Sequence, residues 1–157
     1  MKLNSQMKNI IDRIGLDPEA PVQLLPALAV LVEPGFVRLN GAIVLRALAQ
    51  GARAVSLSDF PDETGYESFV NHIHIEDYMP HGGEPTSASA LLTNGISLAS
   101  SLRKLLRQSF PGEEFEVILT LQENHCAVRF HKKRMGELWL GDDLDDYEGE
   151  ALMVLHG

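Results

Sequence analysis

The chain has 157 residues, of which 45% are hydrophobic and 22% are charged, and its formal net charge at pH 7 is −9. A chain of this length predicts one globular domain, which needs no disulfide or metal to fold. Its acidity disfavours general nucleic-acid binding, because carboxylates repel phosphate backbones.

The charge is unevenly distributed along the chain. Residues 1–60 carry six Lys and Arg against five Asp and Glu, whereas residues 61–157 carry seven against seventeen. The single cysteine, Cys126, cannot form an internal disulfide, which is typical of a reducing compartment. No apolar run reaches the ~18–20 residues of a membrane span, and the N-terminus lacks the apolar core of a signal peptide. We therefore expect a soluble, cytoplasmic protein.

Helical spacing of apolar residues begins near the N-terminus. Four apolar side chains between Met7 and Ile14 predict a helix over residues 6–15. A second segment, 23–32, is expected to be helical in part. Its regular portion would begin at Pro26, because proline is favoured in the first turn of a helix.

The Asn40–Gly41 pair permits two interpretations. Asn-Gly between apolar residues is a strong signal for a two-residue hairpin turn. The residues that follow are good helix formers, and Gly51 would end a helix there. We favour a helix over 41–50 with Asn40 as its N-cap, which makes the N-terminal part, about 1–51, helical.

Two strands are predicted next, over residues 52–58 and 68–78. The second is the clearest alternation of the sequence, with Ile73 and Ile75 on one face and polar side chains on the other. The two strands are close enough in sequence to pair antiparallel.

The remaining elements follow from periodicity. Leucines repeat every three to four residues over 88–109 and predict a long helix, in which Leu102 and Leu106 face the sheet. Alternating residues over 115–121 and 126–131 predict a hairpin, and the apolar run 151–155 predicts a terminal strand.

This order of elements predicts the fold class. We expect a single α+β domain over residues 1–157, with a mostly antiparallel sheet of about five strands and helices packed on one face. The sheet and the central helix would occupy about residues 52–157, after the helical N-terminal third.

The predicted strand 68–78 carries a candidate metal site. His72, His74 and Glu76 would share one face, and imidazoles at i and i+2 are able to converge on Zn²⁺, Ni²⁺ or Fe²⁺. His131 is the best candidate to complete the site, and the loop residue His125 is also able to approach. The alternative is a polar sheet face with no ligand.

A basic cluster at 129–134 and an acidic run at 142–150 stand out in the last third. The simplest expectation is that the two pair with each other locally. Leu144 and Tyr147 have the spacing of one helical turn that packs inward, with its carboxylates outward. The acidic run lacks the central glycine and ligand pattern of an EF-hand loop.

Common catalytic motifs are absent from the sequence. It contains no Walker A loop, no G-x-G-x-x-G, no H-E-x-x-H and no G-x-S-x-G. Cys126 lies on the apolar side of its predicted strand and is expected to be a core thiol.

We therefore favour a non-enzymatic protein that binds another protein, of the same general type as immunity proteins, chaperones and regulators. The partner would be basic, no cofactor would be needed, and the oligomeric state is left open. The predicted contact residues are Trp139, Asp142, Asp143, Asp145, Asp146 and Tyr147. The alternative is a metal-dependent enzyme or metal-binding protein that holds a divalent transition metal at His72, His74, Glu76 and His131.

Overall fold

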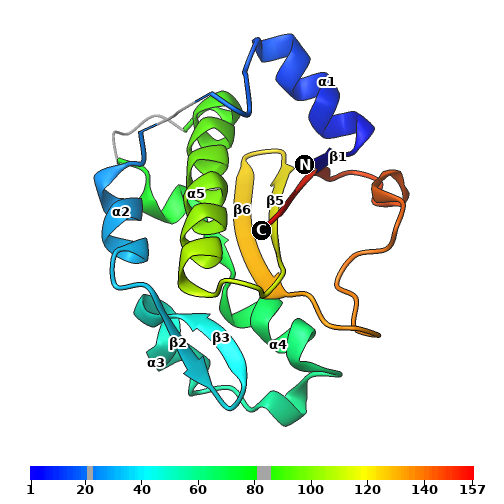
Figure 1. The fold of residues 1–157 in the computed structure, drawn as a ribbon. Coiled ribbons are helices and arrows are strands. Elements are labelled where there is room, and N and C mark those ends of the chain that lie inside the picture. Colours follow the sequence, from blue (N-terminus) through cyan, green and yellow to red (C-terminus); the bar gives the residue numbers. More distant parts are fainter. Residues whose placement is uncertain (21–22, 81–85) are drawn as a thin grey trace.

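The computed structural model describes residues 1–20, 23–80 and 86–157 (Figure 1). Its helices are α1 (Ser5–Ile14), α2 (Pro26–Val32), α3 (Ala49–Ala52), α4 (Glu63–Val70) and α5 (Ala88–Ser109). Its strands are β1 (Lys2–Leu3), β2 (Phe36–Leu39), β3 (Ala42–Leu45), β4 (Ile73–His74), β5 (Phe115–Gln122), β6 (His125–Lys132) and β7 (Ala151–His156). Short 3₁₀ turns are η1 (Arg46–Leu48), η2 (Leu57–Asp59), η3 (Ile75–Tyr78) and η4 (Leu144–Asp146).

Five strands form one antiparallel sheet in the order β1-β7-β5-β6-β4. The long strands β5, β6 and β7 set its register, with Leu119 opposite both Val128 and Met153. Helix α5 lies across β5 and β6, as Figure 1 shows, and α1 and α2 add to the same core. The predicted α+β fold with a five-stranded antiparallel sheet is confirmed.

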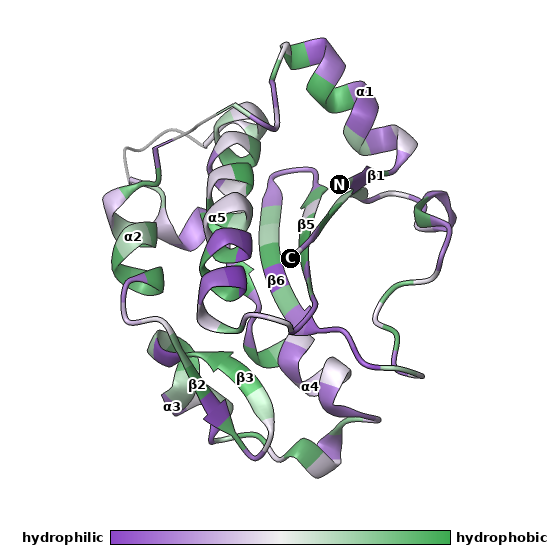
Figure 2. Cartoon of the chain, in the orientation of Figure 1, coloured by the Kyte–Doolittle hydropathy of each residue, from purple (hydrophilic) through white to green (hydrophobic). Residues whose placement is uncertain are grey.

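Helix α5 follows its predicted bounds. The side chain of Ser87 accepts a hydrogen bond from the N–H of Ala90 and so caps the first turn. Leu102 and Leu106 are fully buried in the core under the helix, as expected. Figure 2 shows how hydrophobic the strands beneath it are, in contrast to the hydrophilic C-terminal end of α5.

Gly95 brings α5 unusually close to the sheet. A Cβ at this position would lie 2.5 Å from Cδ1 of Leu119 and 2.8 Å from Sγ of Cys126. Glycine therefore permits close helix–sheet packing at this point. Cys126 is a core thiol as predicted, because its side chain is fully buried. Burial and the charge of Glu76 raise its pKa to about 12.

Helices α1 and α2 agree with the sequence, but the prediction of a helical N-terminal part over about 1–51 is wrong, because β1, β2 and β3 lie in it and β1 belongs to the main sheet. Helix α1 begins after Asn4, whose side chain accepts a hydrogen bond from the N–H of Met7. Helix α2 begins at Pro26, as predicted. None of the helices in the described parts of the chain is both long enough and apolar enough to cross a bilayer.

The predicted helix over 41–50 is wrong. Asn40 and Gly41 form the two-residue turn of a β2–β3 hairpin, in which Leu39 pairs with Ala42. Both turn residues have positive φ, 51° for Asn40 and 95° for Gly41, which is the backbone that a type I′ turn requires. The local turn signal therefore outweighed the helix propensity of the residues that follow.

The predicted strands over 52–58 and 68–78 are also wrong. The first region holds the end of α3 and the turn η2, while most of the second is α4 and η3. Only Ile73 and His74 pair with β6. Asp62 caps α4 through the N–H of Gly65, and Tyr66 and Val70, one turn apart, are buried. Helical periodicity at 63–70 therefore prevailed where the alternation in sequence had suggested a strand.

Candidate functional site

The structure brings His72 and His74 together. Their ring centroids lie 4.4 Å apart at the start of β4. Nε2 of His72 lies 3.1 Å from Nη2 of Arg129 on β6, so His72 accepts a hydrogen bond there. Burial, helped by the charges of Arg129 and His74, lowers the pKa of His72 to about 4. His72 is therefore a neutral imidazole near pH 7.

Glu76 contacts the tip of the β5–β6 hairpin. Its carboxylate accepts the N–H of Cys126 at 3.2 Å and lies 3.0 Å from Nδ1 of His125. Nδ1 of His74 is 3.7 Å from the same carboxylate oxygen as His125. Burial alone would raise the pKa of Glu76, but backbone and His125 hydrogen bonds outweigh it and lower that pKa. Turn η3, which the sequence did not predict, places Glu76 beside this loop.

The fourth predicted ligand, His131, lies elsewhere on the sheet. It is 2% exposed and its Nε2 is 3.5 Å from Oε2 of Glu116 on β5. Its Nδ1 is 3.1 Å from the carbonyl oxygen of Lys132. The described residues contain no group of three or more His, Cys, Asp or Glu side chains placed to hold a metal ion. The four predicted ligands are therefore not assembled here, and metal binding stays a prediction.

The acidic run lies over the other face of the sheet. Leu144 in η4 is buried against Ile118, Leu152 and Val154, and Tyr147 packs beside it. This is the inward-facing turn expected from their spacing. Most carboxylates of the run point outward: Asp142, Asp143, Asp145, Asp146 and Glu148 are exposed, and Glu150 is half-buried.

Asp145 has a structural role that the sequence did not reveal. Its carboxylate accepts hydrogen bonds from the N–H of Ser5 at 2.7 Å and from Oγ of Ser5 at 3.0 Å. Together with Asn4 it satisfies the first turn of α1, 140 residues away in sequence. Asp143 in turn accepts the N–H of Asp145 at 3.0 Å. Of the predicted contact residues, Asp145 therefore anchors the loop.

The expected ion pairs between the basic cluster and the acidic run do not form, and only an attraction between Arg129 and Glu150 remains. The cations of 129–134 bind other carboxylates: Arg134 pairs with Glu63 and Glu67, Lys132 with Glu113, and Lys133 with Glu114. No ion pair found among the described residues uses a carboxylate of residues 142–150. Asp142, Asp143, Asp146 and Glu148 therefore have no ion-pair partner among the described residues, whereas Asp145 is bound to Ser5 and Glu150 is attracted by Arg129.

Large apolar side chains lie exposed just before this run. Met135 is 101% exposed, Leu138 is 78% exposed and Trp139 is 37% exposed. Trp139 was predicted from the sequence as a contact residue, whereas Met135 and Leu138 were not. The available signal was that Met135 and Leu138 stand in a polar segment, outside any strand or helix periodicity.

Trp139 and Tyr147 form the walls of a hollow of about 230 Å³ over the sheet. The guanidinium carbon of Arg129 lies 5.2 Å from the centre of the Trp139 ring. The hydroxyl oxygen of Tyr147 accepts the N–H of Gly141 at 2.8 Å. Both aromatic side chains are thus held in place by contacts with their own chain.

Comparison with known proteins places the chain in an uncharacterised family. The chain belongs to the Uncharacterized protein PM0498 family, whose model matches residues 2–156. It is 26% identical over 112 residues to Uncharacterized protein PM0498 of Pasteurella multocida (strain Pm70). That match covers 65% of this chain and 66% of the relative, slightly under two thirds of its length. No solved structure matches the chain.

Proposed function

We propose that this member of the PM0498 family acts by binding another protein through the segment of residues 135–148, here called the acidic loop. The observation that carries the proposal is that exposed apolar side chains and exposed carboxylates without an ion pair lie on one segment. Met135 and Leu138 are the most exposed of these apolar residues, and none of the ion pairs of the described residues uses a carboxylate of 142–148.

This combination suits a protein partner with basic groups around an apolar patch. Apolar anchors supply most of the binding free energy once water is excluded from them. Carboxylates at the rim raise the association rate and select partners of opposite charge. An exposed apolar side chain alone is common on surfaces, so the neighbouring charge is essential to the argument.

The second half of the acidic loop is anchored to the domain, which lowers the entropy lost when a partner binds. Leu144 is buried on the sheet, and Asp145 is bound to Ser5. The hydroxyl of Tyr147 holds the backbone of Gly141. A rigid binding surface of this kind fits a non-enzymatic role such as that of an immunity protein, a chaperone or a regulator.

Site-specific crosslinking tests this proposal. A photo-reactive amino acid replaces Met135, whose side chain contacts solvent only, and the protein is irradiated in its native lysate. The matched control carries the same group at Val30 on α2, another apolar side chain that is 67% exposed. We expect one basic protein to be crosslinked from Met135 and not from Val30. The same proteins crosslinked from both positions would overturn the proposal.

The affinity for the captured partner is then measured with purified proteins. Leu138→Ser and a neutralised acidic loop (Asp142→Asn, Asp146→Asn, Glu148→Gln) should each weaken binding, and binding should weaken further with added salt. The matched control makes the same change in charge at three exposed carboxylates elsewhere: Asp12→Asn, Glu33→Gln and Glu123→Gln. Equal affinities for both triple variants would contradict a role for the acidic loop.

A further inference from the structure

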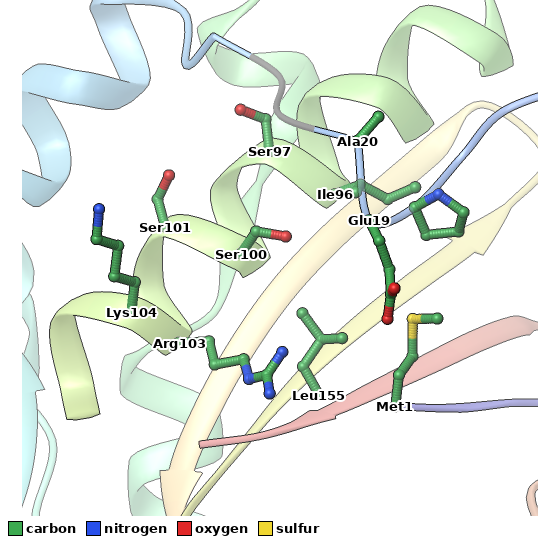
Figure 3. A pocket seen from close by; sticks show the side chains of 11 residues that line it. Met1, Glu19, Ala20, Ile96, Ser97, Ser100, Ser101, Arg103, Lys104 and Leu155 are labelled. Atoms are coloured by element: carbon green, nitrogen blue, oxygen red, sulfur yellow. The ribbon is translucent and has the colours of Figure 1, made fainter.

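We propose that a groove along the C-terminal half of α5 binds a small molecule that carries a phosphate group. The groove lies on the helical side of the sheet, away from the acidic loop, and this inference does not depend on the proposed protein partner. Figure 3 shows it from close by.

The groove is a cavity of about 440 Å³ between α5, β7 and the segment that follows α1. Ser100 and Arg103 line one side, Glu19 lies across from them and Leu155 forms the floor (Figure 3). A second hollow of about 390 Å³ continues along the helix past Lys104 and Arg107. The first volume is within the range of sites for small ligands.

Arg103 and Lys104 line this groove, and Arg107 lines the hollow that continues it, in a protein of net charge −9. Among the described residues, no carboxylate lies within ion-pair distance of Arg103, Lys104 or Arg107. The Nε of Arg103 donates to the carbonyl oxygen of His156 at 2.8 Å, which fixes the guanidinium and leaves its Nη groups for a ligand.

Hydroxyl groups lie on the same helical face as these cations. Ser100 and Ser101 stand three to four residues before Lys104, so their side chains are neighbours on the helix. Neither hydroxyl makes a hydrogen bond to another described residue, and both line the cavity in Figure 3. Guanidinium, ammonium and hydroxyl donors together match the oxygens of a phosphate group.

The helix dipole does not account for this arrangement. Cations are favoured in the last turn of a helix, and Arg107 has that position in α5. Arg103 and Lys104 stand more than one turn before Ser109, the last helical residue, where the effect has declined. A ligand that shares its charge among all three cations explains their common placement.

Glu19 limits how much negative charge the groove accepts. Its carboxylate lies on the wall opposite Ser100 and makes no ion pair with Arg103. It would repel a dense polyanion more strongly than a single phosphate group. The predicted ligand is therefore a phosphate monoester and not a nucleic acid.

Titration of the purified protein with O-phosphoserine and inorganic phosphate, followed by isothermal calorimetry and backbone NMR, tests this site. We expect saturable 1:1 binding, with the largest chemical-shift changes at Ser100, Ser101 and Lys104. Lys104→Gln should weaken binding about tenfold, because it removes one charge-assisted hydrogen bond. Glu19→Gln should strengthen it several-fold, which a loss of folding would not produce.

Lys8→Gln is the matched control, because Lys8 is an exposed lysine on α1 outside the groove. Equal weakening by Lys8→Gln and Lys104→Gln would show a response to net charge and overturn the proposal. The proposal would also be overturned if phosphate binding did not saturate, or if a single-stranded oligonucleotide bound more tightly than O-phosphoserine. None of these outcomes depends on binding at the acidic loop, so the two proposals are tested independently.

Discussion

Nη2 of Arg134 lies 2.8 Å from Oε1 of Glu67, a carboxylate that is fully buried between two sheets. The other oxygen of Glu67 accepts the N–H of Lys132 on β6 at 2.6 Å. Oε1 also accepts the N–H of Ile43 on β3 at 2.6 Å. One side chain of α4 thus joins the β2–β3 hairpin to the edge of the main sheet.

Asn71, one turn after Glu67, extends this connection. Its amide nitrogen donates to the carbonyl oxygen of Ile43 at 2.8 Å, and its oxygen accepts the N–H of Leu45 at 3.0 Å. The backbone groups along the buried edge of β3 are therefore satisfied by side chains of α4. This accounts for the fully buried state of both polar residues.

We expect Glu67→Ala to lower the free energy of unfolding by about 3–5 kcal/mol. The change leaves Arg134 without its buried partner and two backbone N–H groups without an acceptor. Urea denaturation measures the effect. Glu114→Ala is the control, because its pair with Lys133 is exposed and should contribute less than about 1 kcal/mol. Equal losses in the two variants would contradict the structural role of Glu67.

The sequence predicted best those elements that repeat a local pattern over many residues. Helix α5 and the β5–β6 hairpin each repeat their periodicity over eight residues or more. The predictions of the short elements between residues 41 and 78 were wrong, because long-range contacts determine the structure there. The alternation over 68–78 was clear, but the structure there is set by long-range hydrogen bonds of Glu67 and Asn71 that no local pattern reveals.

The candidate sites were predicted in part, for a similar reason. The i and i+2 spacing placed His72 beside His74, but the position of His131 relative to them depended on the register of β4 against β6, in which His74 pairs with Ala127. The helical spacing of Leu144 and Tyr147 predicted that the carboxylates of the acidic run point outward. It did not predict that Asp145 caps α1, because that contact joins segments far apart in sequence.

Gly95→Ala should destabilise the protein by about 1–3 kcal/mol, although alanine is the better helix former by about 1 kcal/mol. The added Cβ would meet Leu119 and Cys126 at distances shorter than van der Waals contact. Gly51→Ala in α3 is the matched control, because no atom lies within 4 Å of a Cβ at that position. In thermal unfolding, Gly51→Ala should leave the melting temperature unchanged or raise it. A stabilised Gly95→Ala variant would contradict the close packing.

Metal binding is tested on protein purified without a histidine tag. We expect Zn²⁺, Ni²⁺, Mn²⁺ and Fe²⁺ to leave the melting temperature unchanged, because Glu76 is already hydrogen-bonded to His125 and Cys126. His131 faces Glu116 and is not available as a third ligand. A stoichiometric metal that is lost in a His72→Ala/His74→Ala variant would contradict this expectation and favour the metal-dependent alternative.

His72 should make the stability of the protein depend on pH below neutrality. Its pKa is about 4 in the folded protein, against 6.5 for an ordinary histidine. Between these values the unfolded chain binds a proton that the folded protein does not. The stability is therefore complete above about pH 6.5 and falls as the pH drops towards 4.

The contribution of His72 to this slope should be about 1–2 kcal/mol, once solvent screening of a half-buried group is allowed for. His72→Gln removes the titrating group and keeps an oxygen that accepts a hydrogen bond from Arg129. Urea denaturation at pH 4.5, 5.5, 6.5 and 7.5 should show a flatter profile for this variant than for the wild type. An NMR titration that finds the His72 ring protonated at pH 6 would contradict the buried, neutral state on which the slope depends, because a charged ring would be desolvated beside the guanidinium of Arg129.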